Sequence, residues 1–195
     1  IIRPIFEIKN SVESTLKKKN EIILVGSFTW APKKENLMNL LNSKNFGRLH
    51  SNNINLTIIG NADSSLVKEI NSNFKGVKMT GRVENVDSFY RLAKIAIVPE
   101  ILGGGFKLKV AEAALQKSAI FSIKGAITKC NLIKNKHFIE AEDADDLIDK
   151  IITFQNHDDK LNVMIDEAYK IAQLDFTKNK FENDILEIIN SRQNN

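Results

Sequence analysis

Three consecutive glycines followed by two lysines form the stretch of this sequence with the clearest chemical potential. Gly103, Gly104 and Gly105 follow a β-branched run, and Lys107 and Lys109 open a helical pattern. Glycine backbone can adopt positive φ and approach a ligand closely, and the free N–H groups at a helix start attract anions. Lysines there oppose the helix dipole unless an anion lies between them and the backbone. The spacing predicts a phosphate-binding turn; the alternative is a flexible glycine loop with solvated lysines.

One glutamate continues this pattern along the predicted helix. Glu112 shares a helical face with Leu108 and Lys109, one to two turns after the glycines. A carboxylate at that position can accept two hydrogen bonds from ribose hydroxyls when phosphates occupy the helix start. The alternative is an ordinary surface glutamate, which is where most glutamates lie. We favour ribose binding because of the distance from the glycines.

A second candidate loop follows the first predicted strand, from Gly26 to Lys33 and Lys34. Ligands of open α/β sheets bind outside the carboxyl ends of strands, so either lysine could reach a diphosphate; isolated lysines are also commonly solvated. The loop GSFTWA lacks the G-x-G-x-x-G fingerprint, which argues against NAD. Gly81 ends the third predicted strand and Arg82 follows it; either could shape the nucleotide side, with a structural turn as the alternative.

Other kinds of site find little support in the sequence. The histidines, His50, His137 and His157, are far apart, and the single cysteine Cys130 excludes an intrachain disulfide and a cysteine-based zinc site. No G-x-S-x-G, H-E-x-x-H or P-loop motif is present. The net charge is only +4 and the lysines are scattered, unlike a dedicated DNA-binding protein. We therefore expect no metal, no further cofactor and no nucleic-acid partner.

Short apolar runs alternate with helical patterns, which predicts an α/β fold: a Rossmann-like parallel sheet of about six strands with helices on both faces. The predicted strands are residues 21–26, 55–60, 77–81, 95–99, 119–123 and 137–141. The predicted helices are residues 35–42, 64–73, 86–93, 108–116 and 144–154, with two more C-terminal helices at 160–173 and 178–191. Ser64 and Asp143 are the predicted N-caps.

Length and composition suit one domain. A chain of 195 residues with 43% hydrophobic content can bury one core. We expect residues 1–20 to form a linker or an extra N-terminal element and residues 21–192 to form one Rossmann-like domain. The chain begins with Ile1 rather than methionine, so we expect it to be part of a longer protein.

The segment GGGFKLKVAEAALQKSAIFS resembles the G-x-G-x-K-x-K-x-x-E-A-x-A-x-G-x-P segment of group 1 glycosyltransferases, within their carboxyl-terminal domain in the two-domain GT-B architecture. The blocks ILVGSFTWAPKKENL, LTIIGNADSSL and VKMTGRVENVDSFYRLAKIAIVPE are similar to the family's other strand-turn blocks, in the same order. The resemblance implies that Glu112 holds the ribose and that Lys107 or Lys109 neutralises phosphate. Gly104, Gly105 and Phe106 would supply backbone near the diphosphate and sugar.

The same resemblance implies the donor-binding domain of a retaining glycosyltransferase that uses a UDP-, GDP- or ADP-sugar, without a metal, in bacterial surface glycan assembly. We expect a cytoplasmic protein that can lie on the inner face of the membrane, with a glycan, lipid or protein as acceptor. The amino-terminal acceptor-binding domain of the family is absent from the 195 residues. We expect it on a partner chain or on the same polypeptide, and we expect this chain alone to be inactive.

Departures from the family pattern, above all at Gly104, support an alternative function. Many members have a glutamate where this chain has Gly104, and arginine where it has Ser27. A non-catalytic scaffold or binding module of the same fold, serving a partner transferase, is therefore the second hypothesis. A different Rossmann-like enzyme, such as a sugar epimerase, is the third, since a fold alone does not fix function.

Overall fold

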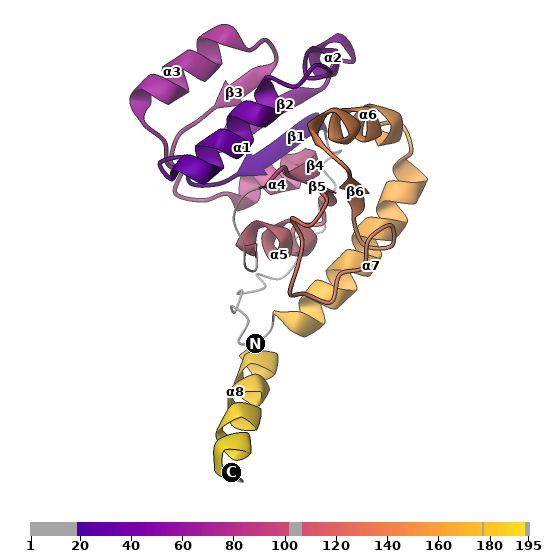
Figure 1. Ribbon diagram of the computed structural model, residues 1–195. Helices are drawn as coiled ribbons and strands as arrows, with labels where there is room; N and C mark the ends of the chain where they lie inside the picture. Colours follow the sequence, from indigo (N-terminus) through magenta and orange to yellow (C-terminus); the bar gives the residue numbers. More distant parts are fainter. Residues whose placement is uncertain (1–18, 102–106, 177, 194–195) are drawn as a thin grey trace.

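A six-stranded parallel β-sheet with helices on both faces forms the body of the protein (Figure 1). The computed structural model describes residues 19–101, 107–176 and 178–193. The strands are β1 (Lys19–Val25), β2 (Asn55–Ile59), β3 (Val77–Met79), β4 (Ala93–Val98), β5 (Ala119–Ile123) and β6 (Ile139–Ala141). The predicted α/β class and strand number are thereby confirmed.

The strand order is β3-β2-β1-β4-β5-β6, and every pair is parallel. In register, Ile22 of β1 lies opposite Leu56 of β2 on one side and Ile95 of β4 on the other. The chain builds outward from β1 to β3, then crosses to β4 and builds in the other direction. The carboxyl ends of β1 and β4 therefore form the switch point at which open α/β sheets bind their ligands.

Two apolar cores lie on opposite faces of the sheet because successive strand residues point to opposite sides. Ile22 and Leu24 of β1 belong to one core, and Ile23 belongs to the other. The first core is covered by α1 (Ala31–Leu41), α2 (Gly47–Ser51), α3 (Ser64–Asn73) and α6 (Ala144–Phe154). The second is covered by α4 (Asp87–Leu92) and α5 (Leu108–Leu115).

The helix α7 (Asp158–Asp175) reaches both cores. Leu161 and Ile165 in its first half pack in the first core, while Ala168 and Ala172 pack in the second. Helix α8 (Lys178–Gln193) follows and extends away from the body of the molecule (Figure 1). No helix within the described ranges is long and apolar enough to cross a membrane.

Helix starts differ in how well the sequence predicted them. Asp143 is the N-cap of α6, and its side chain accepts a hydrogen bond from the backbone N–H of Asp146, as predicted. The prediction of Ser64 as a cap is wrong, because Asp63 occupies the extended N-cap position and Ser64 is the first helical residue. Helix α2 was not predicted from the sequence, because its five residues are too few to show a helical period.

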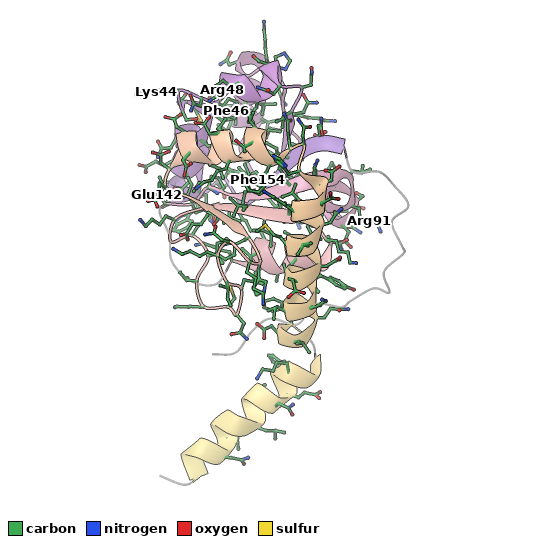
Figure 2. All side chains as sticks on the ribbon, turned by 90° about the vertical axis from the view of Figure 1, so that its right-hand side faces the viewer. Lys44, Phe46, Arg48, Arg91, Glu142 and Phe154 are labelled. Atoms are coloured by element: carbon green, nitrogen blue, oxygen red, sulfur yellow. The ribbon has the colours of Figure 1, made fainter. Side chains whose placement is uncertain are left out.

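Side-chain contacts fix α2 against α6. Arg48, labelled beside Phe46 in Figure 2, forms an ion pair with Asp149 of α6. Asn45 also donates its backbone N–H to Asp145 at 2.8 Å. These contacts hold the α2 segment against α6, and both elements pack on the first core.

The carboxyl ends of β1 and β2 approach each other so closely that one position must be glycine. Gly60 has a φ of +142°, and a Cβ there would lie 1.6 Å from the carbonyl oxygen of Gly26. Gly26 itself donates its N–H to the carbonyl of Ile59 at 2.9 Å. The two glycines let the strands stay paired up to the edge that carries the site.

Candidate functional site

The chain brings two helix starts and several charged side chains together at the switch point. Helix α1 begins shortly after β1 and carries Lys33 in its first turn, with Pro32 near its start. Glu100 follows β4 directly after Pro99, and α5 carries Lys109 in its first turn. Neither helix has an acidic residue in its first turn. Two helix starts with lysines and no acids favour a bound anion.

A buried carboxylate joins the two lysines. The Nζ atoms of Lys33 and Lys109 donate to the same oxygen of Glu100, Oε1, at 2.6 and 2.5 Å. The exposed fractions of the side chains are 18% for Lys33, 10% for Lys109 and 2% for Glu100. Lys109 therefore does not fit the alternative of a solvated lysine. We call Lys33, Glu100 and Lys109 the lysine–glutamate cluster.

A third lysine faces this cluster. Lys107 is the N-cap residue of α5, and only 8% of its surface is exposed. Burial lowers the pKa of the Lys107 ammonium, Glu100 raises it, and Lys33 lowers it. Lys107 is thus within the electrostatic field of the cluster, which gives this edge an excess of positive charge.

Burial and the contacts within the cluster shift the pKa values of Glu100 and Lys109. Burial raises the pKa of Glu100, but Lys109 and Lys33 outweigh this effect, so the pKa lies below its usual range. Burial lowers the pKa of Lys109, and the neighbouring Glu100 carboxylate only partly offsets the loss of hydration. Glu100 is therefore ionised at neutral pH, and its charge favours the ammonium form of Lys109.

Glu112 lies on α5, as Lys109 does, and is held by a residue of α4. The hydroxyl of Tyr90, a buried residue of α4, donates to Glu112 Oε2 at 3.3 Å. Burial raises the pKa of Glu112 above its usual range, against the lowering effect of that hydrogen bond. Burial, Glu112, Glu100 and Asp87 raise the pKa of Tyr90, so its hydroxyl stays protonated and donates. The half-buried carboxylate keeps a defined position one helical turn from Lys109.

Glu100 was not predicted from the sequence, and neither was Asn36, which helps to place it. Asn36 of α1 accepts a hydrogen bond from the backbone N–H of Ile101 at 3.0 Å, which fixes the chain next to Glu100. The available signal was an acidic residue directly after a buried strand, at the edge where parallel-sheet ligands bind. Pairing it with Lys33, 67 positions away, required the strand order.

The other predicted site residues lie at different places. Lys34 is exposed, and Arg82 is exposed at the end of β3, which β2 separates from β1. Gly26 lies at the end of β1 beside the switch point, where it contacts Gly60. The predicted residues Gly103, Gly104, Gly105 and Phe106 lie outside the described residues.

Exposed apolar side chains adjoin the cluster. Trp30, Ile101 and Leu108 are 53%, 58% and 53% exposed. Trp30 is the N-cap of α1, while Ile101 follows Glu100 and Leu108 precedes Lys109. Apolar surface next to a few oriented polar groups is typical of small-molecule sites.

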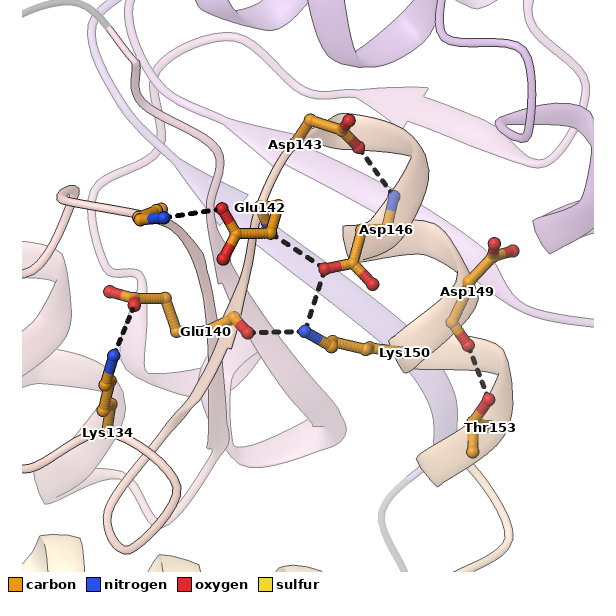
Figure 3. A network of polar contacts seen from close by, with 9 residues as sticks. Lys134, Glu140, Glu142, Asp143, Asp146, Asp149, Lys150 and Thr153 are labelled. Atoms are coloured by element: carbon orange, nitrogen blue, oxygen red, sulfur yellow. Dashed lines mark hydrogen bonds and ion pairs between the residues drawn. The ribbon is translucent and has the colours of Figure 1, made fainter.

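A second charged group, at the turn from β6 into α6, is explained by local structure (Figure 3). Lys150 donates to the carbonyl of Glu140 at 2.7 Å and to Asp146 at 2.8 Å. Glu142 pairs with Lys124 at 2.8 Å. These contacts stabilise the helix start and the edge strand. In the described part of the chain, no group of three or more His, Cys, Asp or Glu side chains could hold a metal ion.

The chain belongs to the family of group 1 glycosyl transferases, whose family model matches residues 19–157. That match includes the strands, the lysine–glutamate cluster and Glu112. No curated protein matched the chain in a sequence search.

Solved structures of similar fold include glycosyltransferases. TarM of S. aureus has a TM-score of 0.75 at 15% identity, over 95% of this chain and 38% of TarM. HepE of Anabaena, solved with UDP and glucose, has a TM-score of 0.68 at 15% identity, over 89% of this chain and 49% of HepE. The C-terminal domain of LpcC, a group 1 family protein of Francisella tularensis, has a TM-score of 0.62 at 15% identity, over 83% of this chain and 88% of that domain.

These structural similarities show the fold. The chain spans less than half the length of TarM and HepE and most of the isolated LpcC domain. The 195 residues thus correspond in size to one domain of such an enzyme.

Proposed function

We propose that this chain is the donor-binding domain of a retaining glycosyltransferase that uses a UDP-, GDP- or ADP-linked sugar. The observation that carries the proposal is the lysine–glutamate cluster at the switch point, between the starts of α1 and α5. Two helix starts and three lysines around one carboxylate favour binding of a diphosphate.

The lysines and Glu112 have different roles in this proposal. Lys33, Lys107 and Lys109 neutralise the diphosphate, together with N–H groups at the helix starts. Glu112, held by Tyr90, accepts hydrogen bonds from the ribose hydroxyls. During transfer the same positive groups stabilise the leaving diphosphate, which is electrostatic catalysis that needs no metal.

The sugar acceptor requires a second part of the enzyme. The chain spans 38% of TarM and 49% of HepE, and transfer requires donor and acceptor to be held in line. We propose that an acceptor-binding domain, on the same polypeptide or on a partner, completes the site, and that this chain alone binds donor without transferring sugar. A role in bacterial surface glycan assembly, on the cytoplasmic face of the membrane, is part of the same proposal.

One observation favours a second candidate function. Gly104 stands where many members of the family have a glutamate. A domain that kept the fold but lost a sugar-side carboxylate could serve a partner transferase as a non-catalytic scaffold. Such a scaffold would not need to bind nucleotide.

Calorimetric titration with UDP, GDP and ADP tests the proposal, with uridine and inorganic diphosphate as partial ligands. We expect at least one nucleoside diphosphate to bind more tightly than either partial ligand. Lys33→Ala should weaken that binding about tenfold or more, the range for a hydrogen bond to a charged group. The exposed neighbour Lys34 provides the matched control, since Lys34→Ala should leave the affinity nearly unchanged. Absence of binding by every nucleotide would contradict the donor role and favour the scaffold.

A further inference from the structure

Glu100 is buried in a way that stability alone does not explain. One oxygen, Oε1, accepts hydrogen bonds from both lysines, whereas the other, Oε2, is buried without a hydrogen-bond partner among the described residues. Taking a carboxylate and two ammonium groups out of water is unfavourable, and an unpaired oxygen adds to that cost. A buried group of this kind needs another explanation.

The lysines of the site need a negative charge when no ligand is present. Lys33 and Lys109 come from the starts of two helices, whose dipoles already disfavour cations. Lys107 adds a third positive charge nearby. Without a counter-ion, repulsion and burial would drive Lys109 toward its neutral form and separate the ammonium groups.

We propose that Glu100 is a positioning residue that takes the place of substrate phosphate charge in the empty site, holding the ammonium groups of Lys33 and Lys109 at one point between α1 and α5. The role rests on the proposed nucleotide-binding function. It assigns to Glu100 the ordering of the phosphate-binding lysines before the nucleotide arrives. The nucleotide then meets lysines that are already charged and oriented, which reduces the ordering cost of binding.

The proposal has a pH signature whose sign follows from the surroundings of Lys109. The charged or titratable groups that face it are Lys33, Glu100, Lys107, Glu112 and Tyr90, from α1, the segment after β4, α5 and α4. Burial and the two lysines lower the pKa of Lys109, and Glu100 raises it. Removing the Glu100 charge therefore lowers this pKa further. Nucleotide affinity that depends on the Lys109 ammonium is present below this pKa and lost above it. E100Q should therefore lose its affinity at a lower pH than the wild type does.

The test is UDP affinity by calorimetry between about pH 7 and pH 9.5, for wild type, E100Q and E100D. The alkaline loss of affinity in E100Q should move down by about one to three pH units, the range for removing one close opposite charge. E100D keeps the charge and should stay near the wild-type profile. E142Q is the matched control, because Glu142 is exposed, pairs with Lys124, and follows β6, which β5 separates from β4 in the sheet. Any titration of uracil itself is common to all variants.

A second readout needs no nucleotide. NMR titration of ¹³C-labelled lysine should show Lys109 losing its proton at lower pH in E100Q than in wild type. If E100Q does not fold, the calorimetry is repeated with Lys109→Met present in every variant, which removes the most buried ammonium group of the cluster. The profile then reports the remaining site lysines.

Two outcomes separate this role from the function on which it rests. If wild type binds no nucleoside diphosphate, the proposed function is overturned. If wild type binds UDP but the alkaline loss of affinity stays at the same pH in E100Q, or moves equally in E100D and E100Q, only the positioning role is overturned.

Discussion

Replacement of Glu112 by alanine is expected to weaken nucleotide binding while leaving the fold intact. Glu112 is half-buried near the start of α5, and Tyr90 holds one of its oxygens at 3.3 Å. Alanine has the highest helix propensity, so α5 should persist. The main structural loss is one acceptor of the Tyr90 hydroxyl, which keeps the Lys109 carbonyl oxygen at 3.5 Å, so the cost should be about 1 kcal/mol or less.

The size of the binding effect follows from the hydrogen bonds that Glu112 would make. Losing hydrogen bonds between a charged carboxylate and the ribose should cost about 1.5 to 3 kcal/mol. That range corresponds to an increase in Kd of about 12-fold to 160-fold. Calorimetric titration with a nucleoside diphosphate measures it directly.

A change of ligand makes the test specific to the ribose. Wild type should bind the 2′,3′-dideoxy nucleotide more weakly than the ribonucleotide, because the carboxylate then has no hydroxyl to accept from. Glu112→Ala should bind the two nucleotides almost equally. Tyr90→Phe, which removes only the hydroxyl that holds Glu112, should give an intermediate loss. Equal affinity of wild type and Glu112→Ala for the ribonucleotide, or an equal loss for both nucleotides, would refute the assignment.

Three further predictions concern the fold and the missing half. Gly60→Ala should destabilise the protein by about 2 kcal/mol or more and lower Tm by about 4 °C or more, because the new Cβ would meet the Gly26 carbonyl. Gly47 lies in open space, so Gly47→Ala is the control. Equal Tm values for the two variants would contradict the packing argument. Asp143→Ala should lower the free energy of unfolding in urea by about 1 kcal/mol. Asp63→Ala should lower it less, because the Asp63 side chain makes no cap hydrogen bond. The reverse order of the two losses would contradict the capping argument. In a donor-consumption assay, the chain alone should show no acceptor-dependent turnover, whereas the chain joined to an acceptor-binding domain should show it. Robust turnover by the chain alone would move the acceptor site onto this domain.

The strand positions were predictable because buried parallel strands leave a strong local signal. Runs such as Ile22, Ile23 and Leu24 are apolar on both faces, and each of the six ranges predicted as strands overlaps a strand of the structure. The end of β6 was predicted, but its start was placed two residues early, because His137 and Phe138 are buried without belonging to the strand. Burial alone does not separate a strand from the buried chain next to it.

The residues of the candidate site could be proposed from the sequence only where they are close together along the chain. Lys107, Lys109 and Glu112 lie within one short helix and its cap, so their positions in the sequence alone place them near one another. Glu100 was not predicted because its contact with Lys33 depends on β1 and β4 being neighbours. The same holds for Tyr90, which reaches Glu112 from α4, 22 positions away. Long-range pairs of this kind require the order of the strands, which local periodicity does not contain.

The most direct test of the central claim is to map nucleotide binding on this chain by ¹⁵N chemical-shift perturbation with UDP, GDP and ADP. The account predicts that the shifted amides cluster after β1 and after β4 and in the first turn of α5, around Lys33, Glu100 and Lys109. Shifts confined to another region, such as the β6–α6 turn, or no shifts with any of the three nucleotides, would contradict a donor site at the switch point.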